Sequence, residues 1–116
     1  MPWEIEATDA LEEWWRTLTE QEQDDVTAVV ELLGERGPQL PFPCSSGVEG
    51  SKFSHMRELR IQSHGDPIRV FYAFDPRRVA VLLIGGIKTG REKRFYREYI
   101  PKADGLYEAH LESLEG

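Results

Sequence analysis

Three strand-like segments follow one another in the middle of the chain, and the turns that join them are short. The segments are 56–61, 69–74 and 79–84; the first alternates apolar and polar residues, and the last, VAVLLI, is apolar throughout. Alternation is typical of a strand with one buried face, and an apolar run is typical of a central strand. The turns at 64–67 and 75–78 have no room for a crossover helix, so neighbouring strands should run antiparallel. The sequence therefore predicts an antiparallel meander.

A strand and a helical hairpin are predicted before the meander. Residues 3–7 alternate as a half-buried strand does. Asp9 with Glu12, and Thr19 with Glu22, have the spacing of capping boxes that open helices. Apolar residues with helical spacing follow each box: Leu11, Trp14, Trp15 and Leu18, then Val26, Val29, Val30 and Leu33.

The rest of the chain is predicted to be a loop and two short helices. Residues 37–51 carry three prolines and three glycines, which favour a loop. Residues 91–98 are expected to form one helix, and Pro101 suits the first turn of another. The predicted order is β-α-α-β-β-β-α, an α+β fold in one domain, 1–116, with helices packed on an antiparallel sheet.

Several classes of protein are not expected. No apolar run approaches the ~20 residues of a membrane span, and the first residues lack the pattern of a signal peptide. Cys44 is the only cysteine, which excludes a disulfide framework and favours a reducing, cytoplasmic setting. His55, His64 and His110 are too far apart for a metal motif, so neither a metal nor a cofactor is expected.

Charge is divided unevenly along the chain, whose net charge is −7. Residues 1–51 hold twelve acidic and two basic side chains, whereas residues 52–104 hold twelve basic and six acidic ones. Cations bind phosphate and aromatic rings stack on bases, so basic residues interleaved with aromatic ones suit single-stranded RNA. A solvated helix face is the alternative interpretation of the same charge run. The candidate RNA-binding residues are Lys52, Arg57, Arg91, Lys93, Arg94 and Arg97.

Five short motifs in a fixed order connect the strands with the last third of the chain. They are Glu58-Leu59-Arg60, RVFYAFDP from Arg69, VAVLLIGGIK from Val79, Phe95-Tyr96, and IPKAD from Ile100 followed by Tyr107. This set resembles the RelE/HigB toxin superfamily, above all its HigB branch, also described as phage Gp49-like proteins. The resemblance implies a RelE-like fold and a toxin that cleaves mRNA on the ribosome without a metal. The chemistry implied is attack of the 2′-hydroxyl on the adjacent phosphate.

The resemblance also implies roles for four residues. Arg69 matches the family's strand arginine, which contacts the scissile phosphate, and Arg60 matches a basic position on the preceding strand. A structural ion pair with Glu58 is the alternative interpretation of Arg60. Lys88 matches the basic residue after the last strand. Tyr96 matches a catalytic tyrosine of some members, and the nearby charges of Arg94 and Lys88 are expected to favour its ionised form. Since other members use histidine, His55 or His64 is the alternative general base.

Partners follow from the resemblance too: the ribosome, mRNA and a HigA-like helix-turn-helix antitoxin, with no membrane. Toxins of this family are usually basic, whereas this chain is acidic. The antitoxin is expected either on the acidic hairpin 9–36 or on the basic segment 52–104, and charge favours the hairpin. Two alternatives remain: a ParE-like toxin that inhibits gyrase without cutting RNA, and an inactive homologue that only binds its antitoxin.

Overall fold

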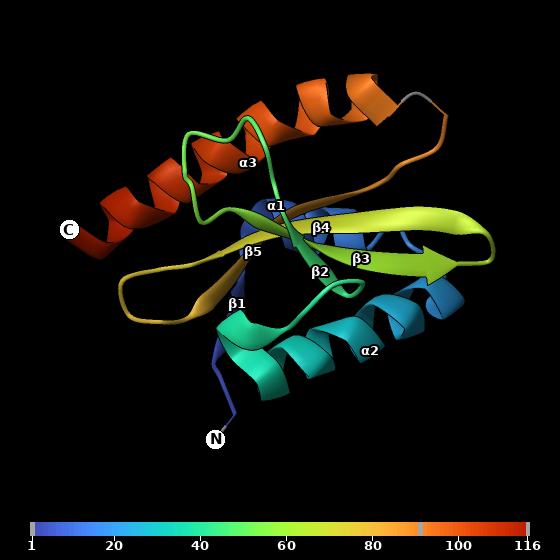
Figure 1. The fold of residues 1–116 in the computed structure, drawn as a ribbon, viewed down its shortest axis with the longest axis horizontal. Helices are drawn as coiled ribbons and strands as arrows, with labels where there is room; N and C mark the ends of the chain where they lie inside the picture. Colours follow the sequence, from blue (N-terminus) through green and yellow to red (C-terminus); the bar gives the residue numbers. More distant parts are fainter. Residues whose placement is uncertain (1, 91, 116) are drawn as a thin grey trace.

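A five-stranded sheet lies between two helical layers in the computed structural model, which describes residues 2–90 and 92–115 (Figure 1). The strands are β1 (Ile5–Ala7), β2 (Ser45–Gly47), β3 (Arg57–Ser63), β4 (Asp66–Phe74) and β5 (Ala80–Ile87), in the order β1-β5-β4-β3-β2. The helices are α1 (Asp9–Trp15), α2 (Glu20–Arg36) and α3 (Glu92–Glu115), with a 3-10 turn, η1 (Gly37–Gln39). Helices α1 and α2 cover one face of the sheet, and α3 crosses the other.

The predicted α+β class and the meander β3-β4-β5 are confirmed, and two strands differ from the prediction. Strand β1 pairs with β5 in parallel, so the sheet is not wholly antiparallel. Strand β2 lies inside the segment 37–51 that was expected to be a loop. The sequence carries little signal for β2 because the strand has three residues, SSG. Its place is set by Ser45, whose buried hydroxyl lies 2.6 Å from the Tyr72 hydroxyl.

The N-cap residue of the first helix lies one position earlier than predicted. Thr8, not Asp9, is the N-cap of α1, and its hydroxyl accepts a hydrogen bond from the Leu11 N–H at 3.0 Å. The second capping box is confirmed. The Thr19 hydroxyl accepts from the Glu22 N–H at 3.1 Å, and the Glu22 carboxylate accepts from the Thr19 N–H at 2.8 Å. Because both groups serve the helix start, Glu22 is a structural residue of α2.

The expected pair of C-terminal helices is wrong: α3 is one helix of 24 residues with Pro101 inside it. A proline in a helix removes one backbone hydrogen bond. Pro101 is exposed, whereas Phe95, Ala103 and Tyr107 are buried against the sheet on both sides of it. Continuous packing therefore holds the helix through the proline. No helix in the described part of the chain is both long and apolar enough to cross a membrane.

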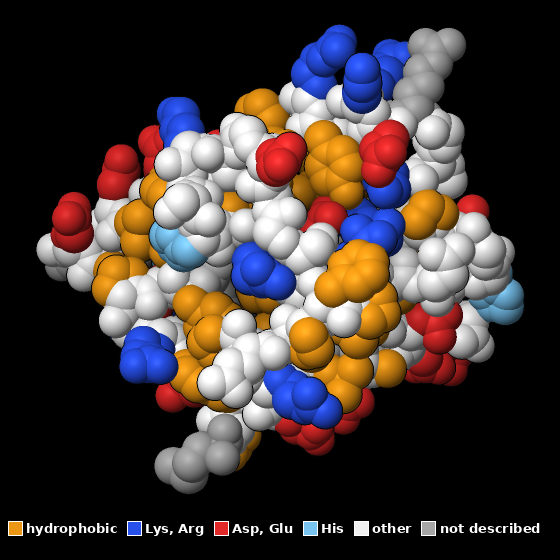
Figure 2. All heavy atoms as spheres, in the orientation of Figure 1, with side chains coloured by type: hydrophobic (Ala, Val, Ile, Leu, Met, Phe, Trp, Pro, Cys, Tyr) orange, Lys and Arg blue, Asp and Glu red, His pale blue; other side chains and the backbone are white. Residues whose placement is uncertain are grey.

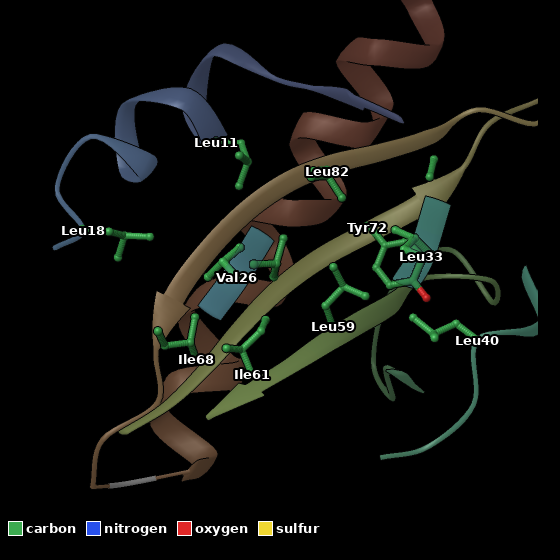
Figure 3. Packing of buried hydrophobic residues seen from close by; sticks show 12 residues of the cluster. Leu11, Leu18, Val26, Leu33, Leu40, Leu59, Ile61, Ile68, Tyr72 and Leu82 are labelled. Carbon is green, nitrogen blue, oxygen red and sulfur yellow. The ribbon is translucent and has the colours of Figure 1, made fainter. Parts of the chain in front are cut away.

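The buried residues of the core between the sheet and helices α1 and α2 are aliphatic apart from Tyr72 (Figure 3), and Trp14, Trp15 and Phe74 pack against them. Its labelled residues come from both sides: Leu11, Leu18, Val26, Leu33, Leu40, Leu59, Ile61, Ile68, Tyr72 and Leu82. Strand residues with odd numbers in β3 face this core, so Arg57 is on the same face as Leu59 and Ile61. Glu58 and Arg60 consequently face α3.

Two glycines in β5 let aromatic rings approach the sheet from opposite faces. A Cβ at Gly85 would lie 2.3 Å from the ring of Trp14, and a Cβ at Gly86 would lie 2.7 Å from the ring of Tyr99. Trp14 belongs to α1 and Tyr99 to α3. The pair therefore sets how closely both helical layers approach the sheet.

Polar contacts fix the C-terminal half of α3. The buried Asp104 carboxylate accepts hydrogen bonds from the Ser51 hydroxyl at 2.5 Å and the Lys52 N–H at 2.9 Å. His110 Nε2 lies 2.8 Å from the Asp75 carboxylate in the β4–β5 turn. Burial by itself would raise the pKa of Asp75, but hydrogen bonds from His110 and Arg77 outweigh it and lower the pKa to about 2. Asp75 thus stays ionised and holds α3 in place.

Replacing Gly85 by alanine should destabilise the protein, because the new methyl group overlaps Trp14. Overpacking of this kind typically costs about 1–3 kcal/mol. Gly105 is the matched control: it is exposed within α3, and a Cβ there meets nothing within 4 Å. Gly105→Ala should stabilise the helix by up to about 1 kcal/mol. Urea unfolding of both variants measures the difference, and equal midpoints would contradict the close approach of Trp14.

Candidate functional site

A buried carboxylate links the sheet to α3. Glu58 on β3 is 4% exposed. The Tyr96 hydroxyl of α3 donates to it at 2.8 and 3.1 Å, and the Ser46 hydroxyl of β2 donates at 3.0 Å. Arg60 Nη1 lies 3.4 Å from the same carboxylate. Three elements of the fold therefore meet at Glu58. The sequence contained one signal for it, the shared face of Glu58 and Arg60.

Arg69 places a second guanidinium beside this carboxylate. It lies opposite Arg60 in the β3–β4 register, and its Nε is 4.0 Å from a Glu58 oxygen. Arg69 is 5% exposed, and its Nη1 donates to the Ile68 carbonyl at 3.1 Å. Its Nε is the one buried side-chain polar atom of the described residues without a hydrogen-bond partner. The cluster thus holds two cations and one anion, so its net charge is positive.

Tyr96 is held in its neutral form. Burial raises its pKa, and so does the hydrogen bond that its hydroxyl donates to the Glu58 carboxylate; together they bring the pKa to about 12. The expectation that Arg94 and Lys88 favour the ionised form is therefore wrong. At neutral pH the Tyr96 hydroxyl carries its proton, and it is a donor rather than a base.

Lys88 lies over one face of the Tyr96 ring. Its Nζ is 5.5 Å above the centre of the Tyr96 ring and 2.9 Å from a carboxylate oxygen of Glu92. Hydrogen bonding from Lys88 lowers the pKa of Glu92. The Lys88 side chain is 14% exposed, so its charge acts on the ring and on Glu92.

An open groove of about 410 Å³ lies over the cluster. Its walls come from the β2 region, β3 and the first turns of α3: Gly47, Val48, Glu49, Glu58, Arg60, Glu92, Lys93 and Tyr96. A second hollow of about 270 Å³ adjoins it at Arg60, which lines both. Figure 2 shows lysine and arginine side chains gathered over the N-terminal part of α3, above this region. The arrangement suits an extended, negatively charged ligand.

The predicted RNA-binding residues are not all in one place. Lys93, Arg94 and Arg97 are exposed on the first turns of α3, near Tyr96. Lys52 pairs with Glu108 at 3.0 Å, about 18 Å along α3 from Tyr96. Arg57 lies on the α2 face, where its Nε donates to the Ser45 hydroxyl at 2.9 Å. Arg91 is outside the described residues.

The two histidines named as alternative bases do not line the groove. His55 Nε2 lies 3.0 Å from the Tyr107 hydroxyl, in the C-terminal half of α3. His64 is exposed at the β3–β4 turn. The described residues hold no group of three or more histidine, cysteine, aspartate and glutamate side chains placed to bind a metal.

Sequence comparison relates the chain to named proteins. Residues 13–108 match the family described as phage derived protein Gp49-like. The chain is 42% identical over 106 residues to putative toxin HigB3 of Mycobacterium tuberculosis, covering 91% of each protein. It is 39% identical over 103 residues to putative toxin HigB2 of the same organism, covering 88% of this chain and 51% of that protein, about half its length.

Two solved structures share the fold. The free E. coli toxin RelE, as an arginine mutant, aligns with a TM-score of 0.61, 14% identity and coverage of 88% of this chain and 98% of that one. A chain of the toxin-antitoxin complex RelBE2 from Mycobacterium tuberculosis aligns with a TM-score of 0.57, 14% identity and coverage of 76% and 100%. At this identity the likeness concerns the fold alone.

The titration of Tyr96 tests the geometry of the cluster. We expect Tyr96 to lose its proton only near its pKa of about 12, which the difference in tyrosinate absorbance between wild type and Tyr96→Phe isolates. Glu58→Gln should lower this pKa, because a neutral amide no longer opposes the negative tyrosinate. Circular dichroism at each pH shows whether the fold persists. A wild-type transition near the ordinary value of 10.0 would contradict the Tyr96–Glu58 hydrogen bond.

Proposed function

The chain belongs to the Gp49-like family of phage-derived proteins and is a RelE/HigB-like toxin, and from this premise we propose that it is a ribosome-dependent mRNA endoribonuclease of a type II toxin–antitoxin system. Its target is mRNA during translation, so its place of action is the cytoplasm. The matched relatives support the toxin, and the groove over Glu58 supports the cleavage reaction.

The observation that carries the proposal is the Glu58 carboxylate, which lines the groove between an arginine and a tyrosine. RNA cleavage by the neighbouring 2′-hydroxyl needs a group that takes a proton, cations that stabilise the charge on phosphorus, and a donor to the leaving oxygen. In the groove, an arginine and a neutral tyrosine each lie within hydrogen-bond distance of one carboxylate. Glu58 therefore replaces Tyr96, His55 and His64 as the proposed base.

The reaction balances with these groups. The 2′-oxygen forms a bond to phosphorus while the bond to the 5′-oxygen breaks, which leaves a cyclic phosphate and a 5′-hydroxyl. Glu58 takes the proton of the 2′-hydroxyl, and the Tyr96 hydroxyl gives its proton to the leaving 5′-oxygen. Tyr96 then recovers a proton from Glu58 along the hydrogen bond of 2.8 Å. Both side chains end in their starting state.

The two arginines have different tasks in this proposal. Arg60 has a side chain that is 28% exposed and lines the groove, so it contacts the phosphate. Arg69 is buried beneath Glu58 and contributes its charge from there. The exposed cations of α3 hold the RNA on either side of the cut. Lys88 holds Tyr96 in position through the contact of its ammonium group with the tyrosine ring.

We expect Glu58→Gln and Arg60→Ala each to abolish growth arrest on induction. Loss of the base should slow cleavage by about 10²–10⁴-fold, and loss of the phosphate contact by about 10²–10³-fold. Mapping of mRNA 5′ ends after induction measures cleavage directly, and thermal unfolding checks the fold. Arg16→Ala is the matched control, because Arg16 is exposed at the end of α1 on the opposite side of the sheet.

The same experiment separates the other functions. Full toxicity of folded Glu58→Gln would rule out this site. Intact mRNA together with gyrase-dependent DNA damage would indicate a ParE-like toxin, and intact mRNA without growth arrest would indicate an inactive homologue.

The proposed partner is a HigA-like helix-turn-helix antitoxin that docks on the acidic hairpin of α1 and α2. The structure shows which acidic residues can be replaced to test this docking without disturbing the fold. Glu22 caps α2, and the Asp25 carboxylate accepts a hydrogen bond from the buried Ser63 hydroxyl at 2.6 Å. Charge reversal at either would disturb the fold. Glu20, Asp24 and Glu31 are exposed on α2 and are the better positions.

We expect the triple variant Glu20→Lys, Asp24→Lys, Glu31→Lys to bind the antitoxin at least about ten-fold more weakly at low salt, since opposite charges on the two surfaces favour association. Titration calorimetry with a HigA-like antitoxin measures the affinity. The comparison variant is Lys93→Glu with Arg97→Glu on the opposite side. If only this second variant weakens binding, the antitoxin covers the groove instead.

A further inference from the structure

The loop between η1 and β2 exposes an aromatic ring. Phe42 is 69% exposed, against 38% for Leu114 and 37% for Ile87, the other exposed large hydrophobic residues of the described chain. It stands between Pro41 and Pro43, which restrict its backbone. The Arg60 guanidinium lies 5.1 Å from the centre of its ring. The ring is thus held in place without being buried.

The ring lies beside an open edge of the sheet. Strand β2 pairs with β3 only over Arg57–Leu59, and the Arg60 N–H donates to the Cys44 carbonyl at 2.8 Å. In an antiparallel strand, N–H and C=O groups point to the same side at every second residue. Gln62 therefore points its backbone N–H and C=O to the same side as Arg60, where the described residues provide no further strand.

The hollow at this edge has the charge and the groups that a nucleotide needs. Its volume is about 270 Å³, and its walls are Pro43, Cys44, Arg60, Ile61, Gln62 and Arg69. Two of these residues are arginines and none is acidic. The exposed Gln62 side chain adds an amide that both donates and accepts hydrogen bonds.

We propose that this hollow and the Phe42 ring beside it form a nucleobase subsite, in which a base of the bound RNA enters the hollow, stacks on Phe42 at its rim and presents its edge to Gln62. The inference rests on the proposed function and adds to it the place of one base. Arg60 lines both the hollow and the groove over Glu58. The stacked base is therefore that of a nucleotide flanking the scissile phosphate, and Phe42 is a specificity residue. A positively charged hollow favours RNA over a protein segment as the ligand of this ring.

Cleavage kinetics on ribosomes programmed with mRNA test the subsite. Removal of one stacked base contact weakens RNA binding by about 5- to 150-fold. Stacking is present in both the bound state and the transition state, so Phe42→Ala should raise KM by this factor and leave kcat nearly unchanged. Phe42→Trp should restore KM. Leu114→Ala, at an exposed apolar position near the end of α3, is the matched control and should behave as the wild type.

The positions of the cuts give a second measurement. Phe42→Ala should weaken the base preference at one position next to the cut, whereas the control should keep it. Unchanged KM and unchanged preference in folded Phe42→Ala, with active wild type, would overturn the subsite alone. Normal cleavage with lost antitoxin binding would make Phe42 a protein-docking residue. Absence of cleavage by the wild type would overturn the proposed function, and the subsite with it.

Discussion

Burial of the Glu58 carboxylate is the constraint on which the rest of the structure depends. Taking a carboxylate out of water costs several kcal/mol unless hydrogen bonds and opposite charges replace the solvent. Tyr96, Ser46, Arg60 and Arg69 supply them from α3, β2, β3 and β4. Because each partner sits on a different element, the cluster fixes the position of α3 on the sheet while it builds the candidate site. The same contacts therefore serve both the stability of the fold and the proposed activity.

The glycines of β5 make that position possible. Gly86 lies opposite Arg69 in the β4–β5 register, and the Tyr99 ring covers it. Tyr96 and Tyr99 are three residues apart and share one face of α3. A side chain at residue 86 would lift this face away from the sheet and lengthen the contact between Tyr96 and Glu58. A backbone requirement in β5 thus controls a hydrogen bond one turn away on the helix.

The parts of the fold that sequence analysis could predict are those decided by neighbours in the chain. The meander and the Thr19 capping box depend on local alternation and spacing, and both are confirmed. The same alternation places Arg57 and Arg60 on opposite faces of β3. A count of basic residues along the chain does not show this difference. The state of Tyr96 was beyond local reasoning, because it depends on Glu58, which is 38 residues distant in sequence. Basic residues close in the chain suggested an ionised tyrosine, whereas the contact across the fold dictates a neutral one.

The distribution of charge makes the proposed RNA surface compatible with an acidic chain. The excess of acidic residues lies in the first 51 residues, and helices α1 and α2 of that segment cover the face opposite α3. The molecule measures 40 × 33 × 26 Å, several times the Debye length of about 8 Å at physiological ionic strength. Charges on the far side of the sheet are therefore largely screened at the groove. Near the groove, Glu49 and Glu92 offset part of the charge of Arg60 and Lys93. In the proposed function, such a balanced site would bind free RNA weakly, and the ribosome would supply the remaining affinity.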